Sequence, residues 1–268
     1  MKKIRQFIGS RLAERFNNAS LRTLSLSGKN LRDFCSNDYL GFARSPELKR
    51  LIIGQLLEEG PTFSVGSTGS RLISGNDDFI EQLESEVAAF HNAESSLIFN
   101  SGYDANIGIF SSIPQRGDTI ILDELIHASI IDGARLSHAS RFTFKHNDLL
   151  SLEEKLKAAR GNIFIGIESI YSMDGDAAPI SEIVALAHSY SAAVIVDEAH
   201  AIGIFGEQGK GMVSQSHLED KIFARIVTFG KALGCHGAAV LCCSDTRKYL
   251  INFARSLSIP QLHLISPI

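Results

Sequence analysis

The chain has 268 residues, 44% of them hydrophobic and 21% charged, with a formal net charge of −4. This composition supports a sizeable buried core in one large or two small domains. The negative charge, with no basic run longer than pairs such as Lys2-Lys3, excludes a general attraction to nucleic acid. Because no stretch has the ~20 apolar residues of a membrane span and the start lacks a signal-peptide pattern, we expect a cytoplasmic protein without a membrane segment.

Two helices are expected before the main pattern begins. Ile4, Ile8, Leu12 and Phe16 recur every four residues, which predicts an amphipathic helical arm over residues 4–18. Residues 19–36 show short alternating segments and lead into the turn S-N-D-Y-L-G. A proline then opens a predicted helix at residues 46–60.

From residue 77 onward, helical and apolar segments alternate. The expected helices are 77–91, 103–113, 130–136, 149–160 and 180–190, and the expected strands are 95–100, 118–123, 141–145, 162–169 and 192–196. Short apolar runs separated by amphipathic helices indicate a mainly parallel α/β sheet covered on both faces. In such sheets, ligands bind at the carboxyl ends of the strands.

Charged residues follow one of these strands directly, in the sequence D-E-A-H at Asp197–His200. Asp197 could simply cap the next segment. D-E-A-H also resembles the Mg²⁺-binding strand end of helicase-type NTPases, but that function requires a phosphate loop of the form G-x-x-x-x-G-K-[ST], which neither Lys210 nor Lys231 provides. We therefore reject the NTPase interpretation and expect no metal site.

A lysine lies further along, in the loop F-G-K-A-L-G-C-H-G between two apolar strands. A lone lysine is usually a solvated surface group. Here Gly230, Gly234 and Gly237 leave room for a bulky planar ligand, and Thr228 offers a hydroxyl suited to a phosphate oxygen. A desolvated amine at Lys231 has a lowered pKa and can condense with an aldehyde.

Several separated motifs, in order, resemble the α-oxoamine synthase family of fold-type-I enzymes that use pyridoxal 5'-phosphate (PLP). They are S-N-D-Y-L-G at 36–41, G-S-T-G-S-R at 66–71, N-S-G-Y-D-A-N at 100–106, L-I-H-A-S at 125–129, K-H-N-D at 145–148, the segment around S-M-D-G-D-A-A-P, D-E-A-H and T-F-G-K. The similarity runs from about residue 20 to 255. It implies a large domain with a mainly parallel seven-stranded sheet between helices and an N-terminal helical arm, and we expect the family's smaller C-terminal domain to be missing from this chain.

The resemblance implies a set of roles around one PLP molecule. Lys231 carries PLP as a Schiff base and later moves the proton at the substrate α-carbon. Asp197 keeps the pyridine nitrogen protonated, so that the ring can accept electrons. His200 and Ser172 are expected to hydrogen-bond around the phenolic oxygen. His127 is expected to stack on the ring and touch the substrate.

The resemblance also assigns the phosphate and the substrates. Gly102 and Tyr103 open a helix whose amides and positive end can receive the phosphate, and Thr228 adds a hydroxyl. Arg22 is expected near the acyl substrate. The resemblance assigns three further residues less firmly, since each could instead brace a loop: Asn37, Glu168 and His146. Asn37 is expected at the substrate.

Members of this family condense an amino acid with an acyl thioester. The motifs resemble most the biotin-synthesis branch, which joins L-alanine to pimeloyl-CoA or a pimeloyl carrier protein and gives 8-amino-7-oxononanoate, CO₂ and free thiol. The close alternative is the glycine-using 2-amino-3-oxobutyrate CoA ligase branch. A pocket that distinguishes the two amino acids by one methyl group gains only ~1–3 kcal/mol.

The C-terminal residues resemble no expected element of the family. We expect an N-terminal helix and arm at 1–40, a PLP-binding large domain at 41–255 and an aberrant tail at 256–268, explained by a frameshift near Arg255 in the gene or its sequencing. The family forms homodimers, so a homodimer is expected. A different hypothesis is that the shortened chain is a catalytically silent remnant that still binds PLP.

Overall fold

The computed structural model describes residues 1–26, 31–58 and 66–258, which divide into two compact units, Met1–Ser36 and the chain from Asn37 onward. The helices are α1 (Lys2–Asn17), α2 (Pro46–Glu58), α3 (Asp78–Phe90), α4 (Gly102–Ser112), α5 (Ala128–Leu136), α6 (Leu149–Ala158), α7 (Ile180–Ser189), α8 (Met212–Gln215) and α9 (Ser244–Phe253). Short 3₁₀ helices cover Phe42–Arg44, Glu207–Gly209, Glu219–Lys221 and Arg255–Ser258.

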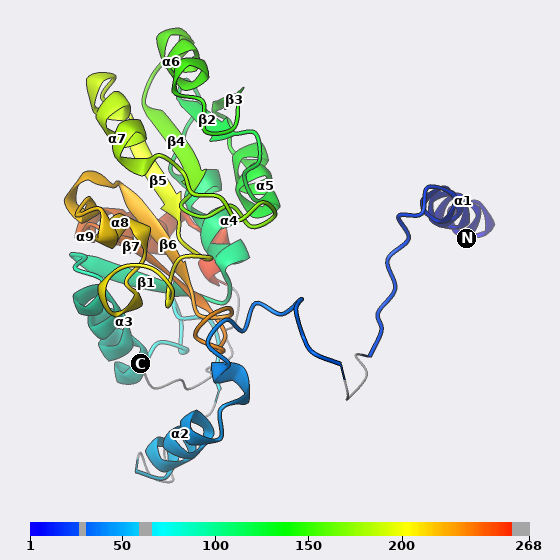
Figure 1. Ribbon diagram of the computed structural model, residues 1–268, viewed down its shortest axis with the longest axis vertical. Helices are drawn as coiled ribbons and strands as arrows, with labels where there is room; N and C mark the ends of the chain where they lie inside the picture. Colours follow the sequence, from blue (N-terminus) through cyan, green and yellow to red (C-terminus); the bar gives the residue numbers. More distant parts are fainter. Residues whose placement is uncertain (27–30, 59–65, 259–268) are drawn as a thin grey trace. The chain divides into compact units, whose positions relative to one another are not determined.

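The strands are β1 (Ser95–Phe99), β2 (Thr119–Asp123), β3 (Ser140–Phe144), β4 (Ile163–Glu168), β5 (Ala193–Asp197), β6 (Ala224–Thr228) and β7 (Ala238–Cys242). They form a seven-stranded sheet in the order β1-β7-β6-β5-β4-β2-β3 (Figure 1). Only β7 runs against its neighbours β1 and β6, while the other pairs are parallel. The predicted mainly parallel seven-stranded α/β sheet is confirmed.

Successive side chains of each strand point to opposite faces of the sheet, and both sets are apolar. Helices therefore cover both faces. On one face, α4, α5 and α9 pack on a core that includes Phe99, Phe110 and Ile226. On the other face, α6 and α7 pack on Ile165 and neighbouring strand residues, and α3 covers the part of the sheet near β1 and β7 (Figure 1). The core is therefore two layers, one on each side of the strands.

Side-chain caps fix where several helices begin. Asp77 accepts a hydrogen bond from the amide of Ile80 at 3.0 Å, and Ser101 accepts one from Asp104 at 3.1 Å. Such caps satisfy backbone donors that have no partner inside the helix and contribute about 1 kcal/mol each. The start of α4 matters most here because it lies next to the candidate site.

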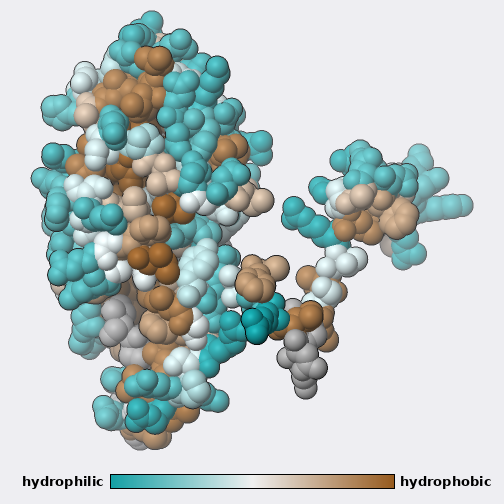
Figure 2. All heavy atoms as spheres, in the orientation of Figure 1, coloured by the Kyte–Doolittle hydropathy of each residue, from teal (hydrophilic) through white to brown (hydrophobic). Residues whose placement is uncertain are grey.

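The Met1–Ser36 unit contains the predicted N-terminal helix. The helix predicted from the four-residue spacing is confirmed as α1. Its apolar residues are all exposed, and the exposed fraction of Phe16 is 71%. Figure 2 shows apolar atoms gathered on one side of this helix. The described part of residues 19–36 contains no strand. No helix among the residues described is both long and apolar enough to cross a bilayer.

The boundaries proposed from the sequence at residues 40 and 255 stay predictions. At the second boundary the chain continues into the Arg255–Ser258 turn, where the hydroxyl of Ser256 donates to the carbonyl of Asp104 at 2.7 Å. Leu257 is buried in the core beneath α4. Residues 259–268 of the expected aberrant tail lie outside the described residues.

Two glycines provide a matched test of this packing. A Cβ on Gly166, in the centre of β4, would lie 2.7 Å from Leu122 Cδ2 and 2.9 Å from Phe110 Cζ. Among the described residues outside its own helix, no atom lies within 4 Å of the corresponding position on Gly54 in α2. We expect Gly166→Ala to lower the free energy of unfolding by about 1–3 kcal/mol through overpacking. Gly54→Ala should raise it by about 0.5–1 kcal/mol, because alanine favours helix.

Urea unfolding of both variants checks this expectation. Equal effects of the two substitutions would contradict the packing described for β4.

Candidate active site

The candidate site lies at the edge of the sheet where β1, β2, β4, β5 and β6 end, hereafter the carboxyl edge. Strand register brings its groups together, since Glu168 at the end of β4 pairs directly with Asp197 at the end of β5. A pocket of about 140 Å³ opens there, lined by Gly102, Tyr103, Asn106, His127, Ser129, Glu168, Asp197, Ala199, Thr228 and Lys231. Residues from five separate segments therefore meet at the position that parallel sheets use for ligands.

Asp197 is buried, and both of its carboxylate oxygens are hydrogen-bonded. Its Oδ2 accepts from the side-chain amide of Asn106 at 2.7 Å, and its Oδ1 accepts from the backbone amide of Ala199 at 2.9 Å. The same Asn106 amide donates to Ser129 at 3.0 Å. These neutral donors hold the carboxylate in one orientation without neutralising its charge.

Lys231 lies in the loop between β6 and β7, hereafter the lysine loop. Burial lowers the pKa of its amine, and the carboxylates of Asp197 and Glu168 oppose that shift. A turn fixes the loop, with the amide of Gly234 donating to the carbonyl of Lys231 at 2.9 Å. Gly234 has φ of +64°, and a Cβ there would lie 2.1 Å from the backbone nitrogen of Ala43, so glycine is required.

His200 contacts the lysine directly. Its Nε2 lies 2.6 Å from Lys231 Nζ, and its Nδ1 lies 2.7 Å from the hydroxyl of Tyr39. Burial and the charge of Lys231 lower the pKa of His200 to about 4. The imidazole is therefore neutral at physiological pH.

Glu168 is 2% exposed, and its Oε1 has no hydrogen-bond partner among the residues described. Burial and the nearby charge of Asp197 raise its pKa to about 7. The backbone amides of His127 and Ser172 and the charge of Lys231 act in the opposite direction. A buried carboxyl with an unpaired oxygen at a pocket wall is a site for a polar ligand group.

The start of α4 forms another side of the pocket. Gly102 is its first residue, and a Cβ there would lie 3.7 Å from Thr228 Oγ1. The Thr228 hydroxyl donates to the carbonyl of Gly237 at 3.3 Å. Tyr103 donates its hydroxyl to Asp132 at 2.6 Å, on α5. A helix N-terminus beside a hydroxyl is suited to an anion.

His127 and Ser172 are both exposed and occupy different places. His127 caps α5 and lines the pocket, and its Nδ1 accepts from the amide of Ser129 at 3.2 Å. Ser172 lies in the turn after β4, and its backbone amide faces the Glu168 carboxyl. Ser172 is not among the residues that line the pocket.

The two residues expected at the substrate lie in different units. Arg22 is an exposed residue of the Met1–Ser36 unit. Asn37 begins the second unit, where its side-chain oxygen accepts a hydrogen bond from the Tyr39 hydroxyl at 3.3 Å.

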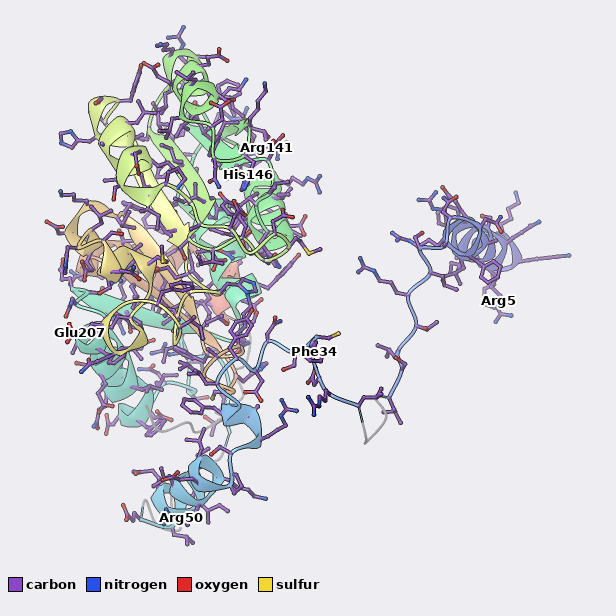
Figure 3. All side chains as sticks on the ribbon, in the orientation of Figure 1. Arg5, Phe34, Arg50, Arg141, His146 and Glu207 are labelled. Carbon is purple, nitrogen blue, oxygen red and sulfur yellow. The ribbon has the colours of Figure 1, made fainter. Side chains whose placement is uncertain are left out.

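His146, which follows β3 (Figure 3), is outside the pocket and braces a loop. Its Nδ1 lies 2.9 Å from Asp123 Oδ1, and its Nε2 lies 2.7 Å from Asp176 Oδ2. Burial lowers its pKa, but the hydrogen bonds to both aspartates outweigh burial, so that the pKa is raised. This is the bracing role that the sequence left open for it.

Sequence reasoning did not single out Asn106, Ser129 or Tyr39. All three belong to motifs that carried the resemblance, but their types gave no chemical signal by themselves. Asn106 lies one helical turn after the residues that open α4, which is a spacing that places it on the same side as the strand ends. Tyr39 is far from His200 in the chain, so only folding shows their contact.

The fold and this pocket define a class of enzyme, and comparison with known proteins gives the same class. Residues 29–264 match the family described as aminotransferase class I and II, to which the chain therefore belongs. Within that family it is a member of the PLP-dependent α-oxoamine synthase group, since its relatives at 42–47% identity are 8-amino-7-oxononanoate synthases. The resemblance stated from the motifs is confirmed.

Individual relatives show the extent of the match. The 8-amino-7-oxononanoate synthase of Emericella nidulans is 47% identical over 271 residues, which cover 96% of this chain and 66% of that protein. The Sphingomonas wittichii serine palmitoyltransferase structure has a TM-score of 0.77 at 32% identity, covering 84% of this chain and 57% of that one. The structure of 8-amino-7-oxononanoate synthase from Francisella tularensis has a TM-score of 0.72 at 31% identity, covering 88% and 65%.

The chain thus spans about two thirds or less of the length of these relatives. Further matched serine palmitoyltransferase structures contain PLP.

The raised pKa of Glu168 makes stability depend on pH. Because the folded state binds this proton more tightly than the unfolded state, the free energy of unfolding is highest below the usual pKa of 4.5 and falls as the pH rises to about 7. Glu168→Gln cannot ionise and should lack this decline. Between about pH 4.5 and about pH 8, the variant should gain on the order of 3 kcal/mol relative to the parent chain.

Urea unfolding at the two pH values measures this difference, and the contribution of buried Glu198, whose pKa is also raised to about 7, cancels in the comparison. The matched control is Glu182→Gln, at an exposed position on α7. Parallel pH profiles for Glu168→Gln and the parent chain would refute the assignment.

Proposed function

We propose that the chain binds PLP through Lys231 and catalyses the decarboxylative condensation of L-alanine with a pimeloyl thioester to give 8-amino-7-oxononanoate, CO₂ and free thiol. The observation that carries the proposal is the shared pocket of a desolvated lysine amine and the buried carboxylate of Asp197. The names of the relatives support this particular reaction. We further propose that the protein acts as a homodimer.

The donors in the pocket fit each polar part of PLP. Lys231 supplies the amine for its aldehyde, and Asp197 supplies a fixed negative charge for its pyridine nitrogen. The start of α4 at Gly102 and Tyr103, together with the Thr228 hydroxyl, suits its phosphate, which carries negative charge.

The remaining proposed contacts lie around the phenolic oxygen and the ring. His200, held 2.6 Å from Lys231, is a neutral group for a hydrogen bond beside the covalent linkage. Ser172 is proposed as its partner from the exposed turn after β4. His127 is proposed to cover the ring face and to meet the substrate, since it lines the pocket from the start of α5.

When bound, PLP supplies an electron sink for the carbanion left by breaking a bond at the substrate α-carbon. Asp197 would hold the proton on the pyridine nitrogen, because Asn106 and the Ala199 amide orient its carboxylate through neutral donors. Lys231, with a pKa lowered by burial, takes and returns the proton at the α-carbon. Arg22 and Asn37 are proposed at the acyl and amino acid substrates.

Covalent capture tests the cofactor proposal. PLP added to the chain should produce an absorption band that Lys231→Ala abolishes, and borohydride reduction should leave PLP on the peptide containing Lys231, as mass spectrometry would show. Lys221→Ala, at an exposed position just before β6, is the matched control and should retain the band. PLP found on other lysines in equal amount would overturn the assignment.

Thiol release tests the reaction. With PLP bound, L-alanine and pimeloyl-CoA should release thiol and CO₂ faster than glycine and acetyl-CoA do. Lys231→Ala should remove the release, because the group that moves the α-proton is lost. Preference for glycine would assign the chain to the 2-amino-3-oxobutyrate CoA ligase reaction, and captured PLP without thiol release would identify a binding remnant.

A further inference from the structure

The segment that begins the second unit contacts the site through a residue that the proposed function does not use. Tyr39 belongs to the motif S-N-D-Y-L-G, and its hydroxyl lies 2.7 Å from Nδ1 of His200. The two rings are 6.2 Å apart and tilted by 50°, so the interaction is a hydrogen bond at the hydroxyl and not a stack. Tyr39 is 43% exposed, so it lies at the surface and not in the core.

Local contacts hold Tyr39 in place. Its backbone amide donates to the carbonyl of Asn37 at 2.9 Å, and the Asp38 carboxylate accepts from the amide of Ala43 at 3.1 Å. The next turn places Gly41 at φ of +72°. Ala43 in turn lies against Gly234 of the lysine loop. The tyrosine and the lysine loop are therefore held by the same short segment.

The donors and acceptors form one directed chain. While Lys231 is protonated, its ammonium can only donate, so Nε2 of His200 must accept. A neutral imidazole that accepts at Nε2 carries its proton on Nδ1 and donates it to the Tyr39 oxygen. The Tyr39 proton then points to the side-chain oxygen of Asn37, 3.3 Å away. Each hydrogen that links Lys231, His200, Tyr39 and Asn37 in this order therefore has an acceptor.

The opposite direction fails at its end. If Tyr39 donated to His200 Nδ1, Nε2 would carry a proton facing Lys231, and a protonated amine cannot accept it. A doubly protonated imidazole is disfavoured as well, because burial and the charge of Lys231 lower the pKa of His200 to about 4. The geometry therefore selects one tautomer as long as Tyr39 and Asn37 complete the chain.

We propose that Tyr39 is a positioning residue that fixes His200 with its proton on Nδ1 and its Nε2 lone pair directed at Lys231, and that Asn37 is the terminal acceptor. The tautomer is a property of the chain by itself. Its consequence for catalysis rests on the proposed function, because it determines whether His200 presents an acceptor or a donor beside the group that Lys231 holds.

Nitrogen NMR of the full chain without PLP, labelled with ¹⁵N-histidine, tests the proposal. The chain has nine histidines, and a His200→Gln spectrum identifies the signals of His200 by their loss. In the parent chain at neutral pH, Nδ1 should give the signal of a protonated nitrogen and Nε2 that of an unprotonated one. Tyr39→Phe keeps the ring and removes the acceptor of the Nδ1 proton, so the His200 signals should shift toward the Nε2–H form, with the neutral amine of Lys231 as the acceptor.

Two variants control for indirect effects. Tyr190→Phe removes a hydroxyl that donates to Glu153 on the far helix pair α6 and α7, and should leave the His200 signals unchanged. Asn37→Ala removes only the terminal acceptor and should shift the signals in the same direction as Tyr39→Phe. Unchanged circular dichroism establishes that the variants are folded.

Two results would overturn the proposal. One is a parent chain whose His200 already carries its proton on Nε2. The other is a folded Tyr39→Phe chain with parent-like His200 signals. Because the measurement needs no cofactor, failure of PLP capture at Lys231 would reject the proposed function and leave the tautomer assignment to be decided by these spectra.

Discussion

The register between β4 and β5 is the constraint on which the site depends. It pairs Glu168 with Asp197, two carboxyl groups at a buried edge where water screens charge poorly. Two ionised groups there would repel each other, and the two carboxyl groups differ in their hydrogen bonds and in pKa. Asp197 has two donors on its oxygens, while Glu168 has an unpaired oxygen and a pKa raised to about 7. The two carboxyl groups are therefore held differently, one by two hydrogen-bond donors and one with a raised pKa.

The other groups are placed in relation to that charge. α4 contributes both Asn106, which holds Asp197, and a helix start that is suited to an anion on a different side of the pocket. The lysine loop brings a single amine to the carboxylates, and burial keeps the amine's pKa low. The segment from Asn37 to Ala43 closes the arrangement by contacting His200 and the lysine loop. The lysine amine, the Asp197 carboxylate and the helix start suited to an anion thus come from separate elements and meet in one pocket.

Much of the fold was predictable because each local signal was consistent with its neighbours. Apolar runs of five or six residues became the strands, and the spacing around Ile4 and Phe16 became α1. The proline at 46 opens α2, as predicted. Strand order was not predictable from local patterns, since nothing in the sequence of β7 states that it inserts antiparallel between β1 and β6. That choice depends on long-range packing of both sheet faces.

For the site, the sequence by itself determined the chemistry available: Lys231 among small residues, Asp197 at a strand end and a helix start after β1. These are short-range features, because strand ends and helix starts are set by neighbours in the chain. Only the tertiary structure decided that Glu168 faces Asp197, that Asn106 orients it and that Tyr39 reaches His200 across 161 positions of sequence. The pKa values and the hydrogen-bond directions depend on burial and on distances between separate elements. Burial and these distances are set only when the strands have paired.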